Sequence, residues 1–137
     1  MDIAYWATVL EIELLAAVAV FQLAVAFGAP LGEYCWGGQN PGVLPKRLRI
    51  SSAFTLVIYA AMAGHYASMI GWLPSLLDEI GRAYVLWGLT AFSGFGVIAN
   101  LATRSRKERA IFAPLAIALL VGNILILVFY RWANQVD

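Results

Sequence analysis

The chain has 137 residues, of which 62% are hydrophobic and only 12% charged, and its formal net charge is +1. Soluble domains contain about 45–50% apolar and about 25% charged residues, so this chain lacks the polar side chains that cover a water-exposed surface. The composition predicts a single domain, residues 1–137, that is solvated by lipid, and the small net charge argues against a nucleic-acid partner. Cys35 is the one cysteine, which excludes an intramolecular disulfide.

Four apolar stretches are predicted to cross the membrane, at about residues 3–29, 51–73, 82–102 and 111–130. Each meets the roughly 20 residues that a helix needs to span the hydrocarbon layer. They must be helical, because an isolated strand would leave its backbone groups unpaired in lipid. The first stretch does not read as a signal peptide, since Asp2 stands where a basic segment belongs and Glu11 and Glu13 interrupt the apolar run.

The connections between these stretches are short, which predicts an all-α membrane protein with an up-down four-helix bundle. Ser105 and Glu108 have the spacing of a capping box, so one helix can close and the next begin within a few residues. Seven lysines and arginines fall in the connections after the first and third stretches, against two on the other side. Basic loops stay in the cytoplasm, so both termini are predicted outside.

The segment at residues 28–49 concentrates glycine and proline between the first two apolar stretches. Irregular backbone cannot be exposed to hydrocarbon, so an ordered loop at the cytoplasmic surface is predicted. Two interpretations stay open: a tight interfacial linker, or a binding loop. The residues of the candidate binding loop are Glu33, Trp36, Gln39, Asn40, Arg47 and Arg49. A nucleotide-binding P-loop is rejected, because Gly38 and Gln39 stand where Lys and Ser or Thr are needed.

A second basic group follows the third apolar stretch and comprises Arg104, Arg106, Lys107 and Arg109. Basic side chains beside a membrane attract anionic headgroups, each contributing about 1 kcal/mol. We therefore expect this group to contact anionic lipid, although the same residues could serve only to set the topology.

Polar side chains inside the apolar stretches are candidates for function, because ionisable groups are costly in lipid. Helical counting places Glu13, His65 and Asn123 at similar depths on three helices, and Ser93 could join them from the remaining helix. A carboxylate–imidazole pair could carry a proton or hold a polar group of a ligand. Alternatively, Glu13 could reach headgroup water and His65 could bond a backbone carbonyl. One His and a distant Cys do not make a metal site, and no cofactor is expected.

Small residues recur at helical spacing in the apolar stretches, as at Ala60, Gly64 and Ser68. Such spacing is typical of close packing between membrane helices. Assembly of several copies through one of these faces is a further interpretation.

The run GAPLGEYCWGGQNPGVLPKRLR, residues 28–49, resembles a signature of small bacterial four-helix membrane proteins of unassigned function. The shared pattern is GAP-x-G, then GG, then LP and Arg. The resemblance implies the four-helix fold and a bacterial plasma membrane, and it transfers no activity or site residue. A looser similarity to small multidrug-resistance transporters rests only on four short helices with a carboxylate in the first.

The sequence is therefore compatible with two functions. The first is a binding or accessory module for an apolar small molecule, a lipid or a partner helix, indicated by four aromatic-rich helices with few polar groups. The second is a small oligomeric transporter that couples to a proton or cation through an intramembrane carboxylate. An enzyme is the least favoured, because no second carboxylate or nucleophile is evident beside Glu13.

Overall fold

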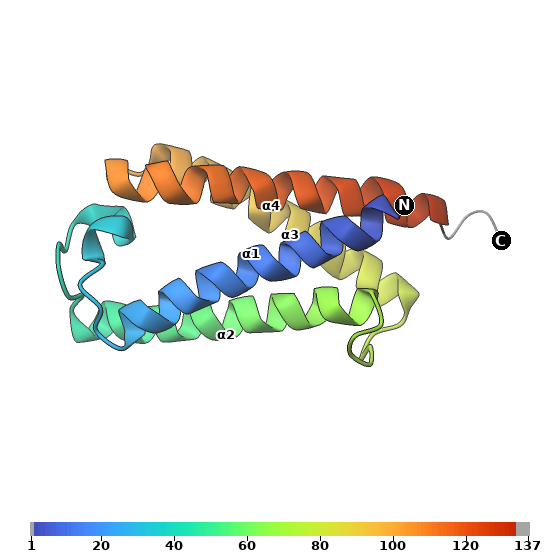
Figure 1. Cartoon of the computed structure of the whole chain (residues 1–137), viewed down its shortest axis with the longest axis horizontal. Helices are drawn as coiled ribbons and strands as arrows, with labels where there is room; N and C mark the ends of the chain where they lie inside the picture. Colours follow the sequence, from blue (N-terminus) through green and yellow to red (C-terminus); the bar gives the residue numbers. More distant parts are fainter. Residues whose placement is uncertain (1, 134–137) are drawn as a thin grey trace.

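The computed structural model describes residues 2–133, with side chains as far as residue 130, and it contains four long helices (Figure 1). These are α1 (Ile3–Ala26), α2 (Lys46–Met69), α3 (Glu79–Ala102) and α4 (Arg106–Ala133), with two short 3₁₀ turns, η1 (Gly32–Tyr34) and η2 (Trp36–Gly38), between α1 and α2. The described residues contain no strand. The four predicted helices are therefore confirmed.

The helix bounds differ from the apolar stretches where turn chemistry overrides hydropathy. α2 begins directly after Pro45, so it includes Lys46, which lies outside the predicted stretch. It ends at Met69, and Gly71 follows with a positive φ of 79° that a helix cannot continue. The helix is therefore shifted toward the N-terminus relative to the apolar run.

The helices run in alternating directions and pack unevenly (Figure 1). α1 packs extensively against α2 and α4, and α3 packs against α4, whereas α2 and α3 have few contacts with each other. The main core cluster contains Ala7, Leu15, Met62, Tyr66, Leu86 and Ile126. The bundle is therefore well packed around α1 and α4 and open between α2 and α3.

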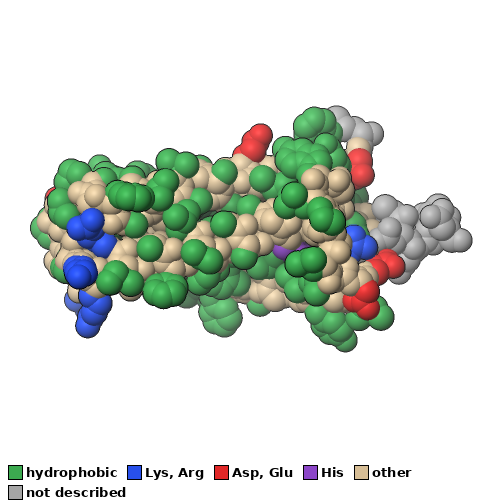
Figure 2. Space-filling view, turned by 90° about the horizontal axis from the view of Figure 1, so that it is seen from below, with side chains coloured by type: hydrophobic (Ala, Val, Ile, Leu, Met, Phe, Trp, Pro, Cys, Tyr) green, Lys and Arg blue, Asp and Glu red, His purple; other side chains and the backbone are tan. Residues whose placement is uncertain are grey.

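The outer surface of the bundle is apolar along its length. Figure 2 shows hydrophobic side chains along the whole length of one face and lysine and arginine side chains gathered mainly at the end that carries residues 27–45. We call this end the loop end, and the end with residues 70–78 the connector end. All four helices are long and apolar enough to cross a membrane. The fold indicates a multi-pass membrane protein.

The loop between α1 and α2 folds back on itself through close backbone contacts. The Gly28 residue follows α1 with a φ of 97°, and the Gly32 N–H donates to the carbonyl of Gly42 at 2.9 Å. At Gly32 two segments of the loop backbone approach so closely that an added Cβ would lie 1.7 Å from the Asn40 carbonyl oxygen. Only glycine fits this position. A small second core packs Cys35 and Leu44 of the loop against Val25 of α1.

Replacing Gly32 with alanine should destabilise the protein, because the added methyl group would force the loop backbone apart. Overpacking of this kind costs about 1–3 kcal/mol. We expect a lower thermal unfolding temperature for purified Gly32→Ala than for the parent protein. Gly64→Ala is the control, since an added Cβ there meets nothing within 4 Å. Equal unfolding temperatures for the two variants would contradict the close approach of the Gly32 and Asn40 backbones.

Candidate functional site

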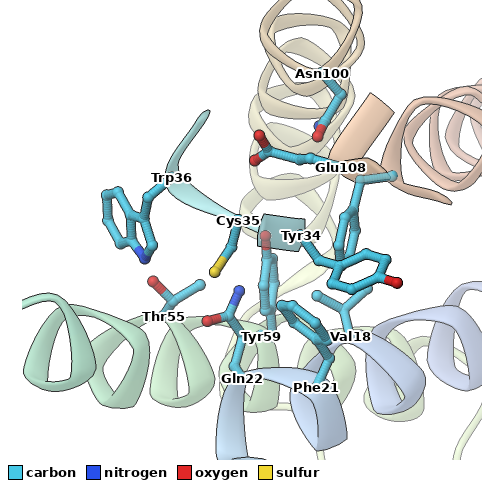
Figure 3. A pocket seen from close by; sticks show the side chains of 11 residues that line it. Val18, Phe21, Gln22, Tyr34, Cys35, Trp36, Thr55, Tyr59, Asn100 and Glu108 are labelled. Carbon is cyan, nitrogen blue, oxygen red and sulfur yellow. The ribbon is translucent and has the colours of Figure 1, made fainter. Parts of the chain in front are cut away.

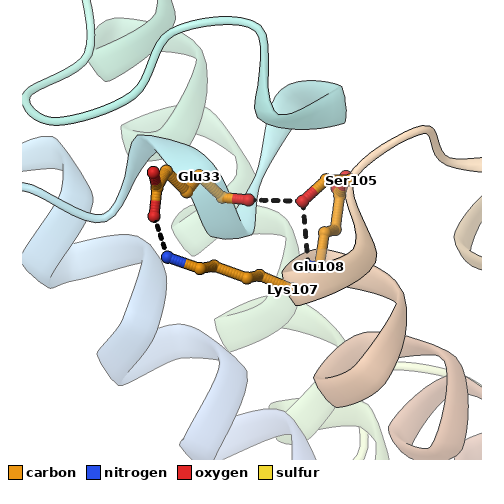
Figure 4. Close-up of polar contacts among 4 residues, drawn as sticks. All are labelled: Glu33, Ser105, Lys107 and Glu108. Carbon is orange, nitrogen blue, oxygen red and sulfur yellow. Dashed lines mark hydrogen bonds and ion pairs between the residues drawn. The ribbon is translucent and has the colours of Figure 1, made fainter.

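The loop is tied to the start of α4 by a group of polar contacts (Figure 4). The Lys107 ammonium pairs with the Glu33 carboxylate, and the Ser105 hydroxyl donates to the Glu33 carbonyl. The Gly37 N–H donates to Glu108 Oε2 at 3.0 Å. An exposed ion pair alone contributes little, so the backbone bonds are the more durable part of this attachment. They hold the loop across the end of the bundle.

Ser105 also caps α4, as its spacing to Glu108 predicts. Its Oγ accepts the Glu108 N–H at 3.1 Å. The return bond of a capping box is absent, because the Glu108 carboxylate instead accepts from the Thr103 hydroxyl and from Gly37. Ser105 therefore both caps α4 and bonds the loop to it.

A pocket of 260 Å³ lies between the loop and the helices (Figure 3). Its wall combines aromatic rings with amide, hydroxyl and carboxylate groups, and α1, α2, α3, α4 and the loop all contribute. The lining residues are Val18, Phe21, Gln22, Tyr34, Cys35, Trp36, Thr55, Tyr59, Asn100, Glu108 and Phe112. A wall that combines aromatic rings with polar groups able to orient a ligand is typical of small-molecule sites.

A second hollow, of 90 Å³, continues toward the middle of the bundle. It shares Val18, Tyr59, Asn100 and Phe112 with the first pocket, so the two are adjacent. Its remaining wall is mostly apolar, and it extends to Ser93 on α3. This hollow lies on the side of the bundle where α2 and α3 have few contacts with each other.

A buried polar cluster lies beyond the second hollow and joins all four helices. The Tyr66 hydroxyl on α2 donates to Asn123 Oδ1 on α4 at 2.5 Å. Asn123 Nδ2 contacts Ser93 Oγ on α3 at 3.1 Å, the Leu119 carbonyl at 2.9 Å and Glu11 Oε2 on α1 at 3.5 Å. An amide NH₂ has two hydrogens, so the longest of these three contacts, to Glu11, is the weakest.

Glu11 is the carboxylate inside the bundle, with only 1% of its surface exposed. Its Oε1 atom is buried without a hydrogen-bond partner. That oxygen packs directly on the backbone of α4, where a Cβ added to Gly122 would lie 2.1 Å away. The absence of a side chain at Gly122 therefore makes the space for Glu11.

The predicted orientation of Glu13 is wrong: its side chain is exposed on the outer surface of α1. Of the four predicted residues, the structure brings together Ser93 and Asn123, and Glu11 takes the place of Glu13. The structure instead buries the other face of α1, which carries Leu15 and Val18. Lipid is as apolar as a protein core, so hydrophobicity does not select the inward face.

His65 is half-buried and does not join the cluster by a hydrogen bond. Its Nε2 has no partner, and its ring packs edge-on to Tyr66 with centroids 5.9 Å apart. It borders a separate hollow of 490 Å³ at the connector end, formed with Gly64, Ser68 and residues 73–77. The expected pairing of His65 with Glu13 is therefore not seen.

The six candidate loop residues fall into different environments. Glu33 holds Lys107, and Trp36 lines the pocket. Arg49 Nε donates to the Ala26 carbonyl at 3.0 Å, which caps the end of α1. Gln39 and Arg47 are exposed, and Asn40 supplies the carbonyl that Gly32 approaches. They do not form one binding surface.

The four basic residues at 104–109 are likewise divided. Lys107 pairs with Glu33, and the Arg109 guanidinium donates to the Thr103 carbonyl. Arg104 and Arg106 are exposed at the loop end. Among the described residues, no three His, Cys, Asp or Glu side chains are grouped as a metal would require.

Sequence reasoning missed the roles of Glu11, Gly122 and Tyr66. The available signal was the Gly122-Asn123 pair, in which a small residue adjoins a polar residue in the middle of an apolar helix. Such a pair can accept a polar side chain from a neighbouring helix.

Comparison of the chain with known protein families, curated proteins and solved structures finds no match.

Cys35 provides a chemical probe of the pocket. Burial and, to a lesser degree, the Glu108 carboxylate raise the pKa of its thiol from 9.0 to about 11. Thiolate is the reactive form, so at about pH 8 alkylation by iodoacetamide should be on the order of 100-fold slower than for a cysteine with an ordinary pKa. The rate should keep rising until the pH approaches about 11.

Glu108→Gln should accelerate this alkylation, since it removes the neighbouring negative charge that contributes to the raised pKa of the Cys35 thiol. Glu79→Gln, at an exposed position near the connector end, is the control and should leave the rate unchanged. A pH profile like that of an unstructured cysteine peptide would contradict the buried environment of Cys35.

Proposed function

We propose that this protein is a membrane binding module for an amphipathic small molecule or lipid, which it holds in the pocket at the loop end. The observation that carries the proposal is the pair of adjoining hollows with four shared lining residues. The first hollow, of 260 Å³, has a mixed polar and aromatic wall, and the second is mostly apolar. This gradient suits a molecule with a polar head and an apolar tail.

The residues of the wall indicate how such a molecule would be recognised. Gln22 and Asn100 carry amide groups that donate and accept hydrogen bonds, and both face the pocket (Figure 3). Phe21 and Phe112 pack edge to face with ring centroids 4.8 Å apart, which provides a rigid apolar wall. The polar head would contact the amides and the loop, and the tail would extend along Phe112 toward α3.

The weak contact between α2 and α3 supports a route to this pocket from the membrane. The second hollow is lined from both helices, including Met62 of α2 and Phe92 of α3. Phe92 is half exposed on the outer surface. An apolar tail could therefore pass between these helices without breaking the well-packed contacts of α1 with α2 and α4.

A photoreactive fatty alcohol with a diazirine on its chain tests this proposal in nanodiscs. Peptide mapping should place cross-links on α2 and α3 residues of the two hollows, and an excess of the unlabelled alcohol should suppress them. Gly96 lines the second hollow, and an added Cβ there meets nothing within 4 Å, so Gly96→Leu should fill the space and abolish these cross-links.

Gly88→Leu is the matched control, because Gly88 is exposed on the same helix and lines neither hollow. It should leave the cross-links unchanged. Cross-links spread evenly over the lipid-facing surface, or equally strong in Gly96→Leu, would refute a specific site.

We further propose that both termini lie outside the cell and that the loop end faces the cytoplasm. The basic residues at 46–49 and 104–109 support this orientation, since seven of the nine lysines and arginines lie in these two segments. The resemblance of residues 28–49 to a bacterial signature favours the bacterial plasma membrane as the location.

A reporter enzyme that is active only in the cytoplasm tests the orientation when it is fused to the C-terminus. We expect low activity there, and high activity for a fusion truncated after Thr103, which ends at the loop end. Strong activity of the full-length fusion would reverse the assignment.

A further inference from the structure

We propose that Glu11 is a reversible proton-binding site in the interior of the bundle, in exchange with water that reaches the hollow at Ser93. This inference does not depend on the pocket holding a ligand. It rests on a carboxyl group that is 1% exposed, has one unpartnered oxygen and adjoins a hollow through shared polar contacts.

No cation pairs with Glu11 among the side chains that the structure describes. Among the described side chains, the one ion pair is Lys107 with Glu33, which lies at the loop end. An isolated buried carboxylate is very costly, so a group in this position neutralises by taking a proton. The protonated carboxyl is the resting state of this site.

The groups around Glu11 come from the three other helices. Asn123 and Gly122 face it from α4, and Asn123 links it to Ser93 of α3 and Tyr66 of α2. Tyr66 is the titratable member of this set, and a tyrosine keeps its proton far above neutral pH. The other ionisable groups that α2 and α3 place near the cluster are Tyr59, which lines both hollows, and His65 and Arg82, which lie near each other at its connector side.

The proposed route to water runs through the second hollow. Ser93 lines the second hollow, and its hydroxyl and the Glu11 carboxyl contact the same Asn123 nitrogen. The proposed path requires one water molecule between Ser93 and Glu11. On release, the O–H bond of the carboxyl breaks, the electron pair stays on Glu11, and the proton passes to water in the hollow. The carboxylate keeps only its long contact, at 3.5 Å, with the Asn123 amide.

Infrared spectroscopy of the protein in nanodiscs tests this site, because the C=O stretch of a protonated carboxyl is separate from the carboxylate and amide bands. We expect a band that is lost in Glu11→Gln and retained in Glu13→Gln. It should shift in D₂O and diminish as the pH is raised. Gly96→Leu, which fills the hollow, should slow the D₂O shift, and Gly88→Leu should not.

A second measurement needs no variant. N,N′-dicyclohexylcarbodiimide reacts with protonated carboxyl groups in apolar surroundings, and tandem mass spectrometry separates labelling at Glu11 from labelling at Glu13. Labelling of Glu11 that falls with rising pH supports the proposal. Absence of an infrared band and of labelling at Glu11 would overturn it. A band that neither shifts in D₂O nor changes with pH would also overturn it, since the proton would then be fixed.

Discussion

The amide of Asn123 is the contact on which the rest of this bundle depends. It lies on α4 with no exposed surface, and it reaches polar groups on α1, α2 and α3. Each interhelical hydrogen bond in a membrane contributes modestly, at about 0.6–2 kcal/mol, but the direction of these bonds is specific. Sliding or rotating one helix would break a bond that no lipid can replace. The amide thus helps to fix the register of the four helices.

The two ends of the molecule are stabilised differently from this centre. At the loop end, backbone groups of the loop bond to Ser105 and Glu108, and Arg49 caps α1. Along the α2–α3 side, few contacts cross between the helices. The hollows occur where the closed loop end adjoins this open side. A ligand there would complete packing that the chain itself leaves unfinished.

The sequence predicts those features that depend only on consecutive residues along the chain. Length and hydropathy predict four helices because the cost of unpaired backbone in lipid allows no other structure. The same reasoning cannot tell Glu11 from Glu13, which are two residues apart on nearly opposite faces. The choice between them is made by Gly122 on another helix, since its bare backbone admits the Glu11 carboxyl. His65 was misplaced for a related reason, because equal depth does not imply a shared face.

The fit of Glu11 against Gly122 also constrains how this sequence can change over time. A carboxyl oxygen occupies the volume in which any other residue at position 122 would place its first carbon. A side chain gained at 122 is therefore compatible with the bundle only after the side chain at 11 has shortened. A shorter side chain at 11 would in turn leave a void beside the Asn123 amide. The side chains at these two positions, 111 residues apart in the sequence, should therefore vary together, so that their combined volume stays about constant.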